Sequence, residues 1–172
     1  MEFDLSGRPF AAGNKDMTFC YASLKDKTGT LVPTVRVPVF FGITGPAQLV
    51  GDNPIMSEAG TAAVLVASDI PKPRCAIYAI CLMNEKDCTR ILSVAASPDG
   101  AKVPDYKIHY TTDGTAPSAR SPVYSGPVKN APQLRAAILV NEEVVARADS
   151  RTSAPATSGN AVSFAKANAQ RE

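Results

Sequence analysis

The stretch from Val37 to Val66 reads VPVFFGITGPAQLVGDNPIMSEAGTAAVLV, and it decides the fold class of this chain. Two apolar runs rich in β-branched residues, 37–43 and 61–66, flank a polar loop at residues 51–60. β-Branched and aromatic residues favour strands, whereas Gly, Pro, Asp and Asn between such runs favour turns. The stretch therefore predicts two buried strands joined by a surface loop, which is a mere connection or carries a site.

Short strands of this kind recur along most of the chain, separated by turns that contain Gly, Pro or Asp. No helix of ten or more residues is needed before residue 87, and such regular spacing is typical of β-sandwiches. The sequence therefore predicts an all-β chain of two consecutive immunoglobulin-like β-sandwich domains with a flexible C-terminal tail. Strands are expected at residues 18–24, 31–43, 47–50, 61–67, 75–83, 90–96, 106–111, 122–128, 134–140 and 143–148.

The last two of these strands have a helical alternative. The run QLRAAILVNEEVVARA, residues 133–148, is rich in residues with high helix propensity. An apolar helix stripe that starts at Leu134 would include Ala137 and Ile138 and then fail at Asn141. We therefore favour a hairpin that turns at Asn141 and Glu142.

The composition is ordinary for a soluble globular protein. The 172 residues are 45% hydrophobic and 20% charged, with a formal net charge of +2. No basic run or stripe suggests nucleic acid or an anionic membrane surface as a partner. The first residues lack the pattern of a targeting signal, and no apolar run approaches the roughly 20 residues that span a bilayer. We expect no membrane span.

The four cysteines predict neither zinc binding nor a disulfide within one strand. No CxxC pair occurs and the sequence has one histidine. Cys75 and Cys81 fall on one expected strand, where six residues separate them by roughly 20 Å, too far for a disulfide. A bridge from Cys20 or Cys88 to one of them stays open, but free thiols that act as small core side chains are favoured.

Candidate catalytic and metal-binding residues are weak throughout. Glu142-Glu143 lie at a turn and diverge, and Asp52 and Glu58 share a loop in which nothing fixes a substrate. His109 lacks a Ser/Asp constellation, so a packed strand histidine is expected. Asp113 precedes Gly114 in a turn without the Asp/Asn spacing of a calcium loop. The sequence predicts no catalytic residue, no metal site and no cofactor.

Carbohydrate contact is the remaining possibility for a site within these residues. Pyranose rings stack their apolar C–H faces on flat exposed aromatic side chains, and the chain has no tryptophan. Tyr106, Tyr110 and Tyr124 are the carbohydrate-contact candidates. Tyrosine in small sandwiches more often packs in the core with its hydroxyl at the rim.

The first half of the chain resembles a C-terminal β-sandwich domain of bacterial glycoside hydrolase family 2, the β-galactosidase group. The resemblance begins at Asp26, Gly29 and Val32-Pro33 and continues at Gly45-Pro46 and Leu49-Val50. Its sharpest part, here called the signature loop, lies within residues 51–60. The residues that define this loop are Gly51, Asp52, Asn53, Pro54, Glu58 and Gly60. On this resemblance, residues 1–16 are a linker and residues 17–86 form the first sandwich.

A second resemblance covers the following residues. The run YKIHYTTDGTAPSARSPVYSGPV, residues 106–128, is similar to the small immunoglobulin-like domain at the C-terminus of chitobiases and β-hexosaminidases. The matching positions are Tyr110-Thr111-Thr112-Asp113-Gly114, Pro117, Ser121-Pro122, Tyr124 and Gly126-Pro127. Residues 87–150 are then a second sandwich, and residues 151–172 are a tail or linker.

Both resemblances imply the same parent, a multi-domain bacterial glycosidase. Family 2 enzymes cleave β-galactosides with a pair of carboxylates in a (β/α)₈ barrel of about 250 residues, which is not present here. The implied function is a non-catalytic accessory region that braces or spaces the barrel. The implied partner is the parent's catalytic domain, with carbohydrate as an alternative, and the implied location is the periplasm or the cell surface.

Two other functions stay open. One is an independent carbohydrate-binding module. The other is an immunoglobulin-like repeat of a surface adhesin, because such repeats share the D-x-x-G and VP pattern of the first strands. Repeated copies of one unit would favour an adhesin, and the two halves of the chain share no evident self-similarity.

Overall fold

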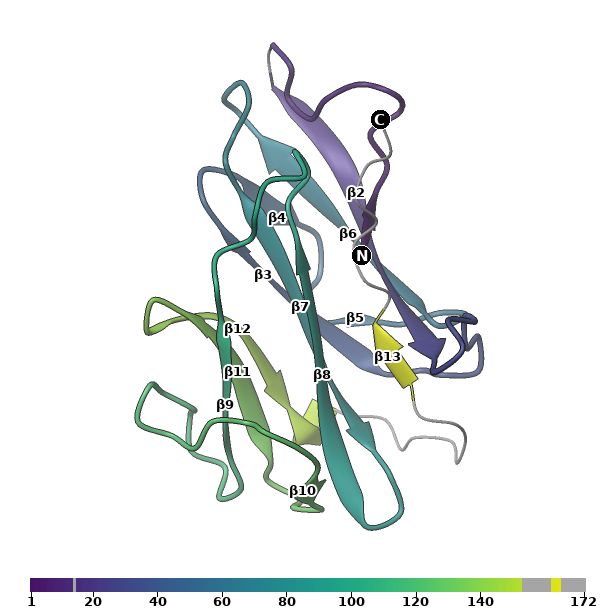
Figure 1. Cartoon of the computed structure of the whole chain (residues 1–172), viewed down its shortest axis with the longest axis vertical. Coiled ribbons are helices and arrows are strands. Elements are labelled where there is room, and N and C mark those ends of the chain that lie inside the picture. Colours follow the sequence, from purple (N-terminus) through teal and green to yellow (C-terminus); the bar gives the residue numbers. More distant parts are fainter. Residues whose placement is uncertain (14, 153–161, 165–172) are drawn as a thin grey trace.

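The computed structural model describes residues 1–13 and 15–152 and the backbone of residues 162–164 (Figure 1). The prediction of an all-β chain is confirmed. The expected tail, residues 151–172, lies mostly outside the described residues.

The strands are β1 (Glu2–Phe3), β2 (Asp16–Asp26), β3 (Pro38–Thr44), β4 (Gln48–Val50), β5 (Ile55–Met56), β6 (Thr61–Ser68), β7 (Ala76–Asn84), β8 (Cys88–Ala96), β9 (Lys107–Thr111), β10 (Val128–Lys129), β11 (Arg135–Val140), β12 (Glu143–Asp149) and β13 (Val162–Phe164). A 3₁₀ turn, η1 (Ser150–Thr152), follows β12.

The strands form three antiparallel sheets. The first sheet has the order β1-β2-β6-β4, and β13 also pairs with β2. The central sheet has the order β10-β8-β7-β3-β5, and the third sheet has the order β12-β11-β9. In Figure 1, β2 and β6 lie on one side of β7 and β8, and the third sheet lies on the other.

Strand β7 explains why the central sheet lies between the other two. Its side chains are buried from Ala76 to Met83, and they alternate between two hydrophobic cores. Ile77, Ala79, Cys81 and Met83 pack in the first core, against the first sheet. Ala76, Tyr78, Ile80 and Leu82 pack in the second core, against the third sheet. A strand that is apolar on both faces must be covered on both faces.

The two sandwiches therefore share their middle layer, whereas the sequence predicts two sandwiches that follow one another. Strand β8, expected to open the second sandwich, pairs with β7 from Thr89↔Asn84 to Ala96↔Ile77. The predicted boundary between residues 86 and 87 falls in the turn that joins these two strands. Whether the ranges 17–86 and 87–150 act as separate domains stays a prediction.

The apolar residues that alternate from Val35 to Ile43 share one face, which the first core buries. Val35, Val37, Val39 and Phe41 are buried in it, and Ile43 packs against it. Strands β2 and β6 contribute the facing layer, from residues such as Cys20, Leu24 and Val64.

Residues 1–16, expected as a linker, are part of this core. Strand β1 pairs with β2 through Glu2↔Tyr21 and Phe3↔Cys20. Met1, Phe10 and Ala11 are buried in the first core. The segment looks like a linker in sequence because Gly7, Pro9 and Gly13 interrupt it and it contains no helix start.

Strands β11 and β12 confirm the predicted hairpin. Asn141 and Glu142 form its turn, with φ angles of 49° and 69°. Two successive residues with positive φ make the tight turn whose twist suits a hairpin, and asparagine tolerates such angles better than most residues.

Two expected strands are shorter than predicted, because both contain prolines that cannot donate to a ladder. Residues 31–37 turn before β3 begins, with a hydrogen bond from the Val35 N–H to the Val32 carbonyl. Residues 122–127 touch β9 through the bridge His109↔Val123, and a strand, β10, starts at Val128.

The third sheet comes into close backbone contact with the central sheet at Gly42 of β3. The pairing of β11 with β12 shifts between Ile138 and Leu139, which leaves Val145 as an extra residue in β12. A Cβ atom on Gly42 would lie 2.2 Å from the Val145 carbonyl oxygen and 2.9 Å from the Cβ of Ala146. Only glycine allows the two backbones to meet at this distance.

We expect Gly42→Ala to lower the free energy of unfolding by about 1–3 kcal/mol, because the added methyl group forces the third sheet away from the central sheet. Urea denaturation of the whole chain measures this change. Gly126→Ala is the matched control, since nothing lies within 4 Å of its added Cβ. Equal stability of the two variants would contradict the close approach of the sheets.

Candidate functional site

The signature loop is held to the central sheet by the side chain of Asn53. Its Nδ2 donates to the Phe41 carbonyl at 2.7 Å, and its Oδ1 accepts the Phe41 N–H at 2.9 Å. Strand β5 pairs with β3 only at Pro38 and Val39, so Asn53 continues the pairing where that short strand has ended. The side-chain amide of Asn53 therefore replaces the backbone of a neighbouring strand as the hydrogen-bond partner of Phe41 on β3.

Ser57 and Gly60 hold the other end of the loop. The Ser57 hydroxyl is buried, accepts the Val37 N–H at 2.9 Å and donates to the Val35 carbonyl at 3.1 Å. At Gly60, φ is +76°, and an added Cβ would lie 2.4 Å from the Val32 carbonyl oxygen. The polar residues of the loop thus satisfy backbone groups that would otherwise be unpaired.

Asp52 and Glu58, the acidic residues of the loop, lie at exposed positions. The backbone of Glu58 exchanges two hydrogen bonds with Thr61, which closes the turn that leads from β5 in the central sheet to β6 in the first sheet. Pro54 follows Asn53 through a cis peptide bond. The loop has the geometry of a connection, in which backbone pairing rather than a carboxylate pair sets the shape.

The three candidate tyrosines pack against the second core. Tyr106 meets Tyr78 edge to face at 5.5 Å between ring centroids, and its hydroxyl lies 3.2 Å from the Ser93 hydroxyl. Tyr110 meets Tyr124 edge to face at 6.4 Å, and the Tyr124 hydroxyl accepts the Ile91 N–H at 3.1 Å. Their role in sugar contact stays a prediction.

His109 and Asp113 have the structural surroundings expected of them. His109 is buried on β9, with its Nδ1 atom 2.7 Å from the Ser121 carbonyl oxygen. Asp113 accepts hydrogen bonds from the Thr115 N–H and hydroxyl, and these bonds lower the pKa of its carboxyl group. Gly114 has a positive φ of 81°, so this segment is a turn. Glu142 and Glu143 are both exposed.

The four cysteines are free thiols. Cys20, Cys75 and Cys81 are buried in the first core, and burial raises the pKa of Cys20 to about 12 and that of Cys75 to about 11. Burial also raises the pKa of Cys88, where the neighbouring Glu85 carboxylate acts in the same direction. A raised pKa disfavours the thiolate, which is the nucleophilic and metal-binding form.

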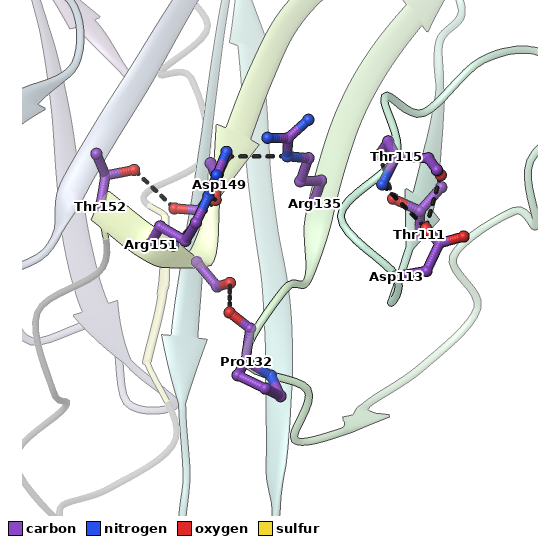
Figure 2. A network of polar contacts seen from close by, with 9 residues as sticks. Thr111, Asp113, Thr115, Pro132, Arg135, Asp149, Arg151 and Thr152 are labelled. Atoms are coloured by element: carbon purple, nitrogen blue, oxygen red, sulfur yellow. Dashed lines mark hydrogen bonds and ion pairs between the residues drawn. The ribbon is translucent and has the colours of Figure 1, made fainter.

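A network of charged groups lies where β12 ends (Figure 2). Asp149 accepts a hydrogen bond from the Arg135 Nε at 3.0 Å and another from the Arg151 Nη2 at 2.7 Å. The hydrogen bonds from Arg151 lower the pKa of Asp149 to about 2, and the charge of Arg135 adds to this effect. The network fastens the end of the β11–β12 hairpin, and its charges satisfy one another.

Among the residues that the structure describes, no three His, Cys, Asp or Glu side chains are placed to hold a metal ion together. Within the same residues, no helix is long and apolar enough to cross a membrane.

Two parts of the chain can be compared with known proteins. Residues 91–148 match the chitobiase/beta-hexosaminidase C-terminal domain. This match starts within β8 and ends within β12, so it contains β9 and β11 of the third sheet in full. A beta-galactosidase from Thermoanaerobacter pseudethanolicus is 40% identical over 57 residues, which are 33% of this chain and 8% of that protein. No solved structure gives a significant match.

These comparisons confirm the resemblance to the chitobiase/β-hexosaminidase C-terminal domain, now over residues 91–148. The resemblance to beta-galactosidase is confirmed at the level of a partial match. That match spans less than a tenth of the beta-galactosidase, so the activity of the relative is not transferred with it. Assignment of residues 17–86 to family 2 stays a prediction.

The sequence did not predict the side-chain contacts that fix the signature loop and the end of the β11–β12 hairpin. Asn53 was part of the signature loop, but its contact with Phe41 gives no signal in sequence. The pairing of Asp149 with Arg135 could not have been found either, because a regular hairpin would place Ala148 opposite Arg135, and only the register shift between Ile138 and Leu139 brings Asp149 there.

We expect Asn53→Ala to lower the free energy of unfolding by about 1–3 kcal/mol, because the N–H and carbonyl of Phe41 lose their partners. Asp52→Ala is the control. This exposed neighbour should change stability by less than about 0.5 kcal/mol. Chemical denaturation of both variants tests the difference, and a neutral Asn53→Ala would show that the amide is not needed.

Asp149→Asn should lower the free energy of unfolding by about 1–2 kcal/mol at pH 7, since a lowered pKa stabilises the fold above the unfolded value. This contribution is lost as pH falls from the ordinary value of 3.8 through about 2, so wild type and variant should converge in acid. Urea titrations at pH 7 and near pH 2 measure it. Asp105→Asn, at an exposed carboxylate 3.9 Å from Lys102, is the control and should change stability at pH 7 by less than about 0.5 kcal/mol.

Proposed function

We propose that this chain is a non-catalytic accessory region of a glycoside hydrolase of the β-galactosidase kind. The observation that carries the proposal is the match of residues 91–148 to the chitobiase/beta-hexosaminidase C-terminal domain. The identity of 40% to part of a beta-galactosidase supports the same class of parent. Membership of residues 17–86 in glycoside hydrolase family 2 is part of this proposal.

The geometry of the described residues is consistent with a supporting role. The carboxylates of the signature loop, Asp52 and Glu58, are exposed on a loop shaped by Asn53 and Ser57. The best organised carboxylate, Asp149, is neutralised by two arginines. Retaining and inverting glycosidases both need a pair of carboxylates that face one scissile bond.

The shared central sheet suits a brace or a spacer. The central sheet is shared by two cores, and a body built in this way would hold a fixed length and direction. The proposed partner is the catalytic domain of the parent, and the proposed location is the periplasm or the cell surface, reached through the parent. Carbohydrate binding by Tyr106, Tyr110 and Tyr124 and an adhesin repeat stay alternatives without a supporting contact.

The proposal predicts that the purified chain releases no nitrophenol from p-nitrophenyl β-galactoside or p-nitrophenyl N-acetyl-β-glucosaminide. The full-length product of the encoding gene should hydrolyse one of them. Deleting the present residues from that product should lower the melting temperature of the catalytic domain. Hydrolysis by the present chain alone, or an inactive full-length product, would overturn the proposal, and a glycan array on the chain tests the binding-module alternative.

A further inference from the structure

One edge of β2 is shared by two short strands. β1 pairs with this edge at Cys20 and Tyr21, and β13 pairs with it from Leu24 to Asp26 (Figure 1). The opposite edge of β2 pairs with β6. Both short strands run antiparallel to β2, so β13 and β1 follow one another along it in the same direction.

The hydrogen bonds on either side of Lys25 show which way its backbone points. The Leu24 N–H donates to the Gly60 carbonyl at 2.8 Å, on the edge that faces β6. The Asp26 N–H donates to the Thr30 carbonyl at 2.9 Å on the same edge. Successive residues of a strand direct their backbone groups to opposite edges. The N–H and carbonyl of Lys25 therefore point toward β13.

The register of β13 matches this arrangement. Ser163 lies opposite Lys25, and its two neighbours lie opposite Leu24 and Asp26. Facing residues of an antiparallel pair exchange two hydrogen bonds when their backbone groups point toward each other. Ser163 and Lys25 are therefore the hydrogen-bonded pair of β13, and the pairing extends over three residues of β2.

Pairing of β13 also joins the two outer sheets. The chain belongs to the third sheet at Asp149 and to the first sheet at Val162. Strand β13 contacts β8 of the central sheet as well as β2. A closed β13 therefore links all three layers.

Three paired residues make a weak attachment. A strand with few backbone hydrogen bonds opens at a free energy well below that of the whole fold. The buried side chains that the structure describes in the two cores come from residues 1–148. Opening of β13 would leave these side chains packed.

We propose that Val162–Phe164 is a strap that closes the edge of β2 and joins the third sheet to the first, and that it opens while the three sheets stay folded. Opening would release the backbone groups of Lys25 from Ser163. The inference is independent of the proposed function, because it concerns the layers of this chain alone.

Hydrogen–deuterium exchange of single amides, followed by NMR, tests the strap. In the whole chain, the Lys25 amide should exchange at least about tenfold faster than the Leu24 amide, because it needs only the strap to open. In a chain that ends at Thr152, Lys25 should exchange at least about tenfold faster still, while Leu24 keeps its rate.

Ser163→Pro in the whole chain should have the effect of this deletion on Lys25, because proline has no N–H to donate to the Lys25 carbonyl. Gln170→Pro, outside β13, is the matched control and should leave the exchange rate of Lys25 unchanged.

Three results would overturn the proposal. Equal exchange of Lys25 in the whole chain and in Ser163→Pro would show that β13 does not protect β2. Equal protection of Lys25 and Leu24 in the whole chain, or loss of Leu24 protection in Ser163→Pro, would show that β13 opens only when the sheet unfolds. Exchange of Lys25 that slows as the protein is concentrated would assign the strap to a second copy.

Discussion

Burial of the central sheet on both faces is the constraint on which the other layers depend. Removing a large apolar side chain from water stabilises a fold by about 1.5–3 kcal/mol, and β7 directs Tyr78, Ile80 and Leu82 to one face and Ile77 to the other. Without the third sheet, the first of these faces would be exposed. The glycine at position 42 and the extra residue in β12 are what let that sheet come close enough to cover it.

Some of this could be predicted from the sequence because the signal is local. The apolar alternation of Val35 to Phe41 identifies their buried face, and the failure of the helix stripe at Asn141 identifies the β11–β12 hairpin. The layers could not be predicted, because a strand that is apolar on both faces does not say what covers it. The strand at residues 18–24 could be predicted, but only the sheet register places Leu65 and Val50 beside Phe19.

In the candidate site, too, local features could be predicted from the sequence and contacts between distant residues could not. The signature loop was found by its residue types, and its chemistry was sought in Asp52 and Glu58. The atoms that matter in the structure are the amide of Asn53 and the hydroxyl of Ser57, whose partners are backbone groups of β3 and the segment before it. Nearly every residue carries the same backbone donor and acceptor, so the residue types do not show which backbone groups a side chain will bind.

The contact of Asn53 with Phe41 has a counterpart at the opposite edge of the central sheet. There β10 pairs with β8 only at Thr89 and Cys88, and the Tyr124 hydroxyl accepts the N–H of Ile91. Each edge is thus closed by a two-residue strand and then by one side chain. Open edges of apolar sheets invite strand addition from other molecules, which is the first step of aggregation. At both edges of the central sheet, a polar side chain thus occupies backbone groups that an added strand would need.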